Sequence, residues 1–315
     1  MDGFKEFCNV IKDTIAETLP GRNIESVKIN EVTKNNGVVL TGLTIMENGS
    51  NIAPNIYLDG FYQLYQSGTD MTQIKNMIRD EYLRAVPNTH EFDKIMYTDK
   101  NYIYDNVYLR AVNYERNKGN LGVFDRKLDM ALEYRVLAKL DGSNIASFKL
   151  DKNILTTIDL DMGIVRSRAM ENTKLLFPGE IVSMAEKLGM LGMVGEQDIP
   201  GMPQMYICSN VRGVNGATAM FYEELIYDFA AEHNDCSFYI LPSSVHEVIF
   251  IPDSECYDSK ELQDMVKQIN KEVVSNDEIL SDSVYKYDGK TKEIVIAEKG
   301  SEEKTKEQEY DLFRD

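Results

Sequence analysis

The stretch Leu128-Asp-Met-Ala-Leu-Glu-Tyr-Arg-Val136 carries the clearest β-strand pattern in the chain, because its large apolar side chains fall on every second residue. A period of two residues is typical of a strand that packs one face on a core and exposes the other to water. After Asp141-Gly-Ser143, a second strand at Ile145–Leu150 is expected to pair with it. The stretch therefore predicts a sheet with one solvated face.

Strands and helices also alternate in the N-terminal third of the chain. The runs Ile24–Val32 and Val38–Met46 flank Lys34-Asn-Asn-Gly37, a composition that favours a turn, so a β-hairpin is predicted. A capping-box pattern, Asp70 with Gln73, marks the start of a helix after the hairpin. Apolar residues recur at helical spacing before and after the hairpin. They are Phe4, Cys8, Ile11, Ile15 and Leu19 in the first helix and Ile74, Ile78, Tyr82 and Ala85 in the second.

Further helices are predicted in the middle of the chain. One spans about residues 99–117. Its apolar stripe consists of Ile103, Val107, Ala111 and Tyr114. Two others are expected near residues 151–157 and 161–173. The order strand, strand, helix, helix thus occurs at 24–86 and again at 128–173, which indicates a possible duplication of one ββαα module.

The C-terminal third follows a segment rich in methionine and glycine, residues 184–204, which is expected to connect two domains. A strand at Gln204–Ser209 and a strand pair within Ser237–Ile251 predict a second sheet. Asp288-Gly289 predicts a closing β-hairpin. Asp258 is expected to cap a helix with a long buried face. That face consists of Leu262, Met265, Val266, Ile269 and Val273.

The predicted fold class is α+β, with antiparallel sheets covered by helices in two subdomains. Residues 1–183 are expected to form an N-terminal α+β region and residues 205–297 a C-terminal α+β module, with residues 184–204 as the connector. Residues 298–315 are expected to form a disordered acidic tail. At 315 residues the chain is long enough for two hydrophobic cores.

The charge composition limits the classes of partner. The chain has 52 Asp and Glu against 34 Lys and Arg, which gives a net charge of -18. An acidic surface is repelled by phosphate backbones and anionic lipids, so we expect no general nucleic-acid binding and no membrane binding. A protein partner is expected instead, and the composition leaves the oligomeric state open.

Targeting and cysteine patterns point to a cytoplasmic protein. Residues 1–6, Met-Asp-Gly-Phe-Lys-Glu, lack the pattern of a signal peptide, and no apolar run approaches the roughly 20 residues of a membrane helix. The four cysteines show no paired spacing, so we expect reduced thiols, with no metal site and no cofactor. They are Cys8, Cys208, Cys236 and Cys256.

One segment carries the residue types of a hydrolytic triad: Ser243, Ser244, His246 and Glu247 follow Pro242 between two apolar runs. In an extended strand Ser244 and His246 share a face, but about 7 Å separates such neighbours. A serine–histidine hydrogen bond therefore needs a turn at Pro242. In the alternative, structural interpretation, the serine hydroxyls hydrogen-bond the free amides of a turn and His246 is hydrogen-bonded at a strand end.

Two other groups are candidates for binding a ligand. A polar stripe on the helix expected at 99–117 suits a phosphate or carboxylate, or else a solvent face. It consists of Arg110, Asn113, Arg116 and Asn117. Asn215 and Gly216 precede an expected helix, where backbone amides either bind an anion or form a cap.

Several motifs together resemble a conserved family of uncharacterised clostridial proteins, over about residues 1–297. They are Tyr57-Leu-Asp-Gly-Phe-Tyr62, Asn113-Tyr-Glu-Arg-Asn117, Glu171-Asn-Thr173, Met205-Tyr-Ile-Cys-Ser-Asn210 with Gly216-Ala217, Ile240-Leu-Pro-Ser-Ser-Val-His-Glu-Val-Ile249 and Leu280-Ser-Asp-Ser-Val-Tyr285. The Leu-Pro-Ser-Ser-x-His-Glu-Val core is also distantly similar to the YtpQ-like uncharacterised family of bacilli. The resemblance implies a bacterial cytosolic protein, often associated with mobile elements. It implies no substrate, cofactor or catalytic residue.

The sequence favours a non-enzymatic interaction or regulatory protein that binds a protein partner through an acidic or Met-rich surface. This expectation rests on the charge and on the lack of a complete catalytic constellation. The alternative is a hydrolase or small-ligand-binding enzyme centred on Ser243, Ser244 and His246.

Overall fold

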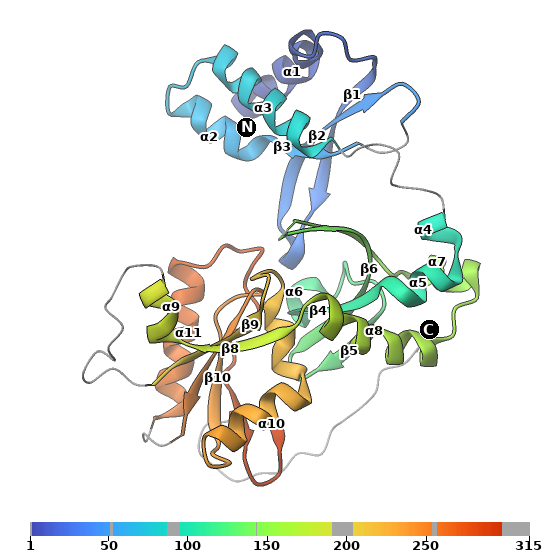
Figure 1. Ribbon diagram of the computed structural model, residues 1–315. Helices are drawn as coiled ribbons and strands as arrows, with labels where there is room; N and C mark the ends of the chain where they lie inside the picture. Colours follow the sequence, from blue (N-terminus) through green and yellow to red (C-terminus); the bar gives the residue numbers. More distant parts are fainter. Residues whose placement is uncertain are drawn as a thin grey trace. The chain divides into compact units, whose positions relative to one another are not determined.

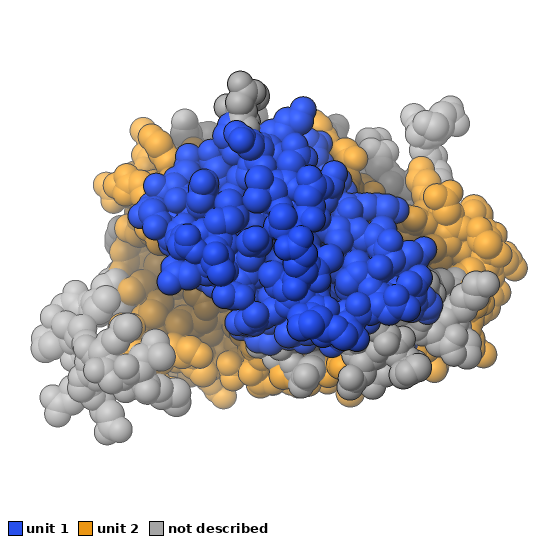
Figure 2. Space-filling model, turned by 90° about the horizontal axis from the view of Figure 1, so that it is seen from above, with its two compact units in different colours: residues 1–96 blue, residues 97–315 orange. Residues whose placement is uncertain are grey.

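The computed structural model describes residues 2–50, 53–86, 95–142, 144–190, 204–253 and 257–297. The chain forms two compact units, Met1–Met96 and Tyr97–Asp315, which Figure 2 shows in blue and orange. Both units combine helices with antiparallel strands, so the α+β class predicted from the sequence is confirmed.

The first unit packs helices on a three-stranded antiparallel sheet (Figure 1). The predicted hairpin is present, and Asn36 and Gly37 take left-handed backbone angles at its turn, with φ of 59° and 71°. The strands are β1 Ile24–Thr33, β2 Val39–Glu47 and β3 Asn55–Tyr57. The helices are α1 Asp2–Thr14, α2 Leu58–Gln66 and α3 Met71–Ala85, with short 3-10 turns η1 Ile15–Thr18 and η2 Asn35–Gly37.

The helical spacing identifies most of the core of this unit, although Phe4 is only partly buried and Ala85 is exposed. On α3, Ile74, Ile78 and Tyr82 are buried, and the Asp70 carboxylate accepts a hydrogen bond from the Thr72 amide as an N-cap. The buried residues of the first helical segment are Phe7, Cys8, Ile11, Ile15 and Leu19, which pack with Leu43, Ile45 and Ile56 of the sheet.

The second unit contains two antiparallel sheets (Figure 1). In the four-stranded sheet, β6 is central and pairs with β4, β5 and β7, and the six-stranded sheet has the order β13-β12-β10-β11-β9-β8. The strands are β4 Val107–Asn113, β5 Phe124–Lys127, β6 Met130–Asp141, β7 Asn144–Lys149, β8 Gly179–Ser183, β9 Tyr206–Asn210, β10 Phe238–Pro242, β11 Val248–Pro252, β12 Tyr285–Asp288 and β13 Glu293–Ile296.

Helices pack on both faces of the six-stranded sheet. Phe229 of α10 contacts Phe238 of β10 on one face, whereas Leu262 and Val266 of α11 pack with Tyr239 on the other. Neighbouring strand residues point to opposite faces, so β10 contributes to both cores. The helices are α4 Ile95–Thr98, α5 Lys100–Asn106, α6 Tyr114–Asn117, α7 Lys152–Ile158, α8 Met162–Leu176, α9 Met184–Met190, the 3-10 helix η3 Gly216–Phe221, α10 Glu223–Glu232 and α11 Ser259–Glu272.

The single helix predicted at residues 99–117 is wrong over Val107–Asn113, and only α5 and the short α6 at its two ends are helical. Asp99 caps α5, but the chain then continues as the strand β4, which pairs along its whole length with β6. The run Val107-Tyr-Leu-Arg-Ala-Val112 is apolar on both sides and fits a strand that is buried on both faces. The apolar residues of β4 have helical spacing, but the segment forms a strand because it pairs with β6.

The solvated face predicted for the strand at 128–136 is also wrong. Glu133 on that face is 1% exposed and the Arg135 side chain is 14% exposed. Met130, Leu132 and Tyr134 are buried on one face of β6, and Ala131 and Glu133 are buried on the other, so both of its faces are covered. The alternating residues therefore place charged groups inside the protein.

The domain boundary observed in the structure differs from the one expected from the sequence. The two compact units divide after Met96, whereas the sequence placed a boundary at 184–204; β8 and β9, which flank that segment, pair with each other in one sheet. Within it, residues 191–203 lie outside the described residues, as does the expected acidic tail at 298–315. The ββαα duplication stays a prediction. In the first unit a third strand, β3, lies between the two strands of the hairpin and the two helices.

The long buried face predicted for the helix after Asp258 is only partly correct. Leu262 and Val266 of α11 are buried against the sheet. Met265, Ile269 and Val273 are instead 50%, 42% and 77% exposed. The apolar arc of the helix is wider than the surface that the sheet covers, so part of it faces solvent.

Candidate functional site

The segment 242–247 forms the turn between β10 and β11. The Ser244 amide donates to the Glu247 carbonyl at 3.1 Å, and the Ser244 hydroxyl accepts a hydrogen bond from the His246 amide at 3.0 Å. The Ser243 hydroxyl donates to the Glu247 carboxylate at 3.5 Å. Both serine hydroxyls are therefore engaged within the turn.

His246 lies beside this turn with both ring nitrogens engaged. Its Nδ1 accepts a hydrogen bond from the Asn215 amide at 3.2 Å, which places the ring proton on Nε2. Nε2 faces the Glu278 carboxylate at 3.4 Å. The imidazole thus links the turn to two segments that are distant along the chain.

Asn215 and Gly216 form a tightly packed turn against His246. Asn215 has a left-handed backbone with φ of 53°, and its amide already donates to His246. The Ser209 hydroxyl donates to the His246 carbonyl at 2.8 Å, and a Cβ atom on Gly216 would lie 2.5 Å from that carbonyl oxygen. The Asn215 amide therefore binds a side chain of the protein where the sequence hypothesis places an anion.

The geometry of this segment does not contain the contact on which serine hydrolysis depends. A general base must reach the serine hydroxyl by a hydrogen bond, and His246 contacts Asn215 and Glu278 instead. Sequence reasoning missed two partners of His246, Ser209 and Glu278. They lie 37 and 32 residues away along the chain, so no local spacing marks them.

A cavity of about 210 Å³ lies next to this turn, lined by Ser209, Arg212 and Glu247 among others. Arg212 donates to the carbonyls of Leu176 and Gly142 at 2.9 Å and 3.1 Å, so its guanidinium already binds the backbone. The volume is below the roughly 300–1,000 Å³ of typical small-molecule pockets. The cavity by itself assigns no ligand.

The polar stripe predicted at Arg110, Asn113, Arg116 and Asn117 is not formed. Arg110 and Asn113 are three residues apart on β4, so they point to opposite faces of the sheet. Asn113 donates to the Leu280 carbonyl at 3.0 Å, and Asn117 donates to the Asn113 carbonyl at 2.8 Å. Arg116 pairs with Asp282 at 3.3 Å. Only Arg110 remains in a constellation that is suited to a ligand.

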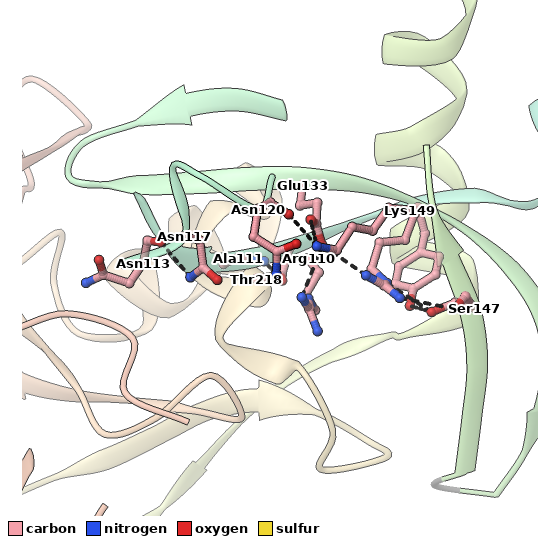
Figure 3. A network of polar contacts seen from close by, with 11 residues as sticks. Arg110, Ala111, Asn113, Asn117, Asn120, Glu133, Ser147, Lys149 and Thr218 are labelled. Carbon is pink, nitrogen blue, oxygen red and sulfur yellow. Dashed lines mark hydrogen bonds and ion pairs between the residues drawn. The ribbon is translucent and has the colours of Figure 1, made fainter. Parts of the chain in front are cut away.

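Arg110 belongs to a group of charged side chains around the Glu133 carboxylate, which we call the Glu133 cluster and which consists of Arg110, Glu133, Arg135 and Lys149 (Figure 3). Glu133 lies 3.1 Å from the Arg110 guanidinium, 3.0 Å from that of Arg135 and 3.8 Å from the Lys149 ammonium. The pairing of strands creates the cluster, because Arg110 is opposite Glu133 on β4 and β6, and Arg135 is opposite Lys149 on β6 and β7.

Hydrogen bonds hold two of the three cations in place. Arg135 donates to the Ser147 hydroxyl at 3.0 Å and to the Ser147 carbonyl at 3.1 Å. Lys149 donates to the Asn120 carbonyl (Figure 3). In contrast, Nε of Arg110 is buried without a hydrogen-bond partner within the described part of the chain.

Burial and mutual repulsion act on the cations of the cluster. Burial lowers the pKa of Lys149; the Glu133 charge opposes this effect, and Arg135 and Arg110 add to it. The pKa of Arg110 is likewise lowered by burial and by the charge of Arg135, against the attraction of Glu133. The cluster therefore holds positive charge that its own carboxylate does not balance. Sequence reasoning missed Glu133, Arg135 and Lys149 because their alternating pattern predicted a solvated face.

The described residues were also compared with the requirements of a metal site and of a membrane-spanning helix. No group of three or more His, Cys, Asp or Glu side chains within them is placed to hold a metal ion. Both ring nitrogens of His233 are hydrogen-bonded, Nδ1 to the Phe229 carbonyl at 2.8 Å and Nε2 to the Tyr206 hydroxyl at 2.9 Å. Over the same ranges, none of the helices combines the length and apolarity needed to span a bilayer.

Comparison with known proteins gives the family and no activity. No curated protein and no solved structure matches the chain. A model of a family of unknown function, DUF5688, matches residues 4–289, which include the turn at His246 and the Glu133 cluster. Because this match spans nearly the whole chain, the protein belongs to the DUF5688 family.

Proposed function

We propose that this protein is a non-enzymatic interaction protein that binds a basic amphipathic segment of a protein partner through α11. The observation that carries the proposal is the exposed apolar stripe of this helix. Met265 and Ile269 of α11 and Val273, the C-cap residue directly after it, recur every four residues, and each is exposed by 42% or more. Residues at this spacing follow one side of a helix, so they present a continuous apolar strip.

The stripe has the properties of a helix-binding surface. Apolar anchors separated by about four residues are what one helix offers to another in groove and coiled-coil recognition. Methionine adapts to the shape of a partner because its side chain is unbranched and flexible. The buried residues Leu262 and Val266 fix α11 to the sheet, so the strip is presented on a packed element.

The charges beside the stripe favour a basic partner. Glu261 precedes Met265 by four residues and Glu272 follows Ile269 by three, so both exposed carboxylates are neighbours of the stripe on the helix surface. The lysines of α11 fall on the side of the helix away from the stripe. They are Lys260, Lys267 and Lys271. A partner with lysine or arginine flanking its apolar face would meet complementary charge, in agreement with the net charge of -18.

Site-specific photo-crosslinking tests this proposal. A photoreactive residue at position 269 should capture a partner in the native host, whereas one at Lys267, on the other side of α11, should not. The captured segment should be basic and amphipathic, and about 0.5 M salt should weaken capture, because charges are screened over a few ångströms at that ionic strength. Equal capture from both positions, or capture that salt leaves unchanged, contradicts the proposal.

The motif resemblance supports a proposal on origin. We infer a bacterial, cytoplasmic protein of clostridial type, distantly related to the YtpQ-like family. The hydrolase alternative predicts covalent labelling of Ser243 or Ser244 by a fluorophosphonate that is lost in His246→Gln. Since the His246 imidazole contacts Asn215 and Glu278 and not the hydroxyl of either serine, we expect no labelling.

A further inference from the structure

We propose that the Glu133 cluster is a phosphate-binding site, in which Arg110, Arg135 and Lys149 hold a phosphate group beside the Glu133 carboxylate. This site is independent of the interaction proposed for α11, because it lies on the four-stranded sheet and α11 packs on the six-stranded one.

The first observation is the charge of the cluster. Three cations, Arg110, Arg135 and Lys149, lie within 3.8 Å of one carboxylate, so the cluster has two positive charges in excess. The nearest carboxylate on the neighbouring strand β5, Asp125, is engaged elsewhere: it pairs with Arg166 at 3.2 Å and accepts a hydrogen bond from Tyr134 at 2.6 Å. Charges inside proteins are normally paired, so an excess of this kind indicates an anion from outside the chain.

The second observation is the free donor on Arg110. Its Nη2 donates to Glu133 at 3.1 Å, while its Nε is buried with no partner among the residues that the structure describes. A guanidinium presents its donors as a planar fork that matches two oxygens of an oxyanion. The unpaired Nε is therefore a buried donor that no described residue satisfies.

The third observation is access. The Glu133 side chain is 1% exposed, but those of Arg110 and Lys149 are 21% and 33% exposed. Figure 3 shows the Arg110 side chain extending away from the β6 ribbon and the Lys149 side chain lying alongside the strand. Parts of the Arg110 and Lys149 side chains are thus exposed while the Glu133 carboxylate is covered, so an anion can approach the cluster from the side of these two cations.

The size of the charge excess distinguishes phosphate from carboxylate. A phosphate monoester carries about −1.5 to −2 charges at neutral pH and three acceptor oxygens, whereas a carboxylate carries about −1. Two excess positive charges and three separate cationic groups match the phosphate. The probe for the test is inorganic phosphate, with acetate as the carboxylate.

Calorimetric titration of the full chain with these probes tests the site at matched ionic strength and pH 7.5. Phosphate should bind at least about tenfold more tightly than acetate. Arg110→Lys keeps the charge and removes the fork, so it should weaken phosphate binding about fivefold or more. Lys149→Gln should weaken it further by removing one charge. Arg116→Lys is the matched control, since Arg116 pairs with Asp282 outside the cluster, and it should leave the affinity unchanged.

Three results would overturn the proposal. They are an absence of phosphate binding to the wild-type chain, equal affinity for acetate and phosphate, and equal phosphate affinity in Arg110→Lys and Arg116→Lys. Circular dichroism of each variant before titration separates loss of the site from loss of the fold. The wild-type comparison of phosphate with acetate decides the question even if one variant does not fold.

Discussion

At the scale of single residues, Gly216 shows how closely the chain packs around His246. A Cβ atom at position 216 would lie 2.2 Å from the Ser209 hydroxyl and 2.8 Å from the Asn210 amide nitrogen. Asn210 belongs to β9, which pairs with β8, and the His246 carbonyl accepts a hydrogen bond from Ser209, so neither group moves away easily. The requirement for glycine here comes from space and not from a positive φ angle.

We therefore predict that Gly216→Ala lowers the free energy of unfolding by about 2 kcal/mol or more, because the new methyl group forces a backbone shift. Gly119→Ala is the control, since nothing lies within 4 Å of a Cβ atom at that position. Urea denaturation of both variants measures the difference. Similar stability of the two variants would contradict the close packing at Gly216.

His246 has a structural role in this geometry, which gives a second prediction. In His246→Gln the Asn215 amide loses its acceptor, the His246 Nδ1 atom, or meets the glutamine amide in a different position. This variant should therefore lose about 1–2 kcal/mol in the free energy of unfolding. Ser243→Ala loses only a 3.5 Å contact with Glu247 and should cost less than about 0.5 kcal/mol. Thermal denaturation of both variants tests this order. The reverse order would show that the turn depends on Ser243.

Glu133 is the most deeply buried charge of its cluster, and its removal should be costly. Glu133→Gln leaves three cations without a counter-charge, so we predict a loss of about 3–5 kcal/mol in the free energy of unfolding. The matched control is Glu115→Gln, in which an ion pair with Lys118 is lost between side chains that are 63% and 62% exposed; the effect should be negligible. Chemical denaturation in low-phosphate buffer gives both values. A small effect of Glu133→Gln would indicate that the cations do not depend on Glu133.

At the scale of secondary-structure elements, α11 carries both buried and exposed apolar residues. Asp258 caps the helix by accepting a hydrogen bond from the Lys260 amide at 2.8 Å, as the sequence predicts. Every apolar residue fits the helical period, yet only Leu262 and Val266 are covered by the sheet. Periodicity defines the apolar side of a helix but not how much of it a neighbouring element covers.

The two sides of α11 should respond differently to a charged substitution. Val266→Asp buries a carboxylate at a position that is 4% exposed and should cost several kcal/mol, enough to unfold the second unit. Ile269→Asp, at a position that is 42% exposed, should cost less than about 1 kcal/mol. Circular dichroism melting curves of the two variants measure this contrast. Unfolding by Ile269→Asp would show that the stripe is covered in the folded protein.

At the scale of the whole molecule, each of the two compact units has a hydrophobic core of its own. The core of the first unit consists entirely of residues between Phe7 and Tyr82, and the cores of the second unit begin at Ile103. A segment with its own core, of about 50–200 residues, is typical of an autonomous domain. The first unit is at the small end of this range.

We predict that residues 1–96 fold on their own. The isolated segment should show a cooperative thermal transition, because its core does not draw on residues of the second unit. A truncation at the boundary expected from the sequence, residues 1–183, should behave differently, since it separates β8 from its partner β9 and should aggregate or unfold. A fragment 1–183 as well folded as 1–96 would contradict the division after Met96.

The amino-acid sequence by itself determined the elements whose signals are local. The hairpin around Asn36 and Gly37 follows from turn composition, the start of α3 follows from the Asp70 cap, and the α+β class follows from the mixture of periods. These features depend on contacts between residues a few positions apart. The local sequence is therefore enough to predict them.

Only the tertiary structure decided which faces are covered and which distant residues meet. Both faces of β6 are covered, so the alternation that predicted a solvated face places Glu133 and Arg135 inside. β4 is a strand because β6 pairs with it, and His246 meets Glu278 through the fold alone. Burial and strand pairing depend on contacts between residues far apart in the chain. A sequence pattern shows which side of an element is apolar, but it does not show which other element packs against that side.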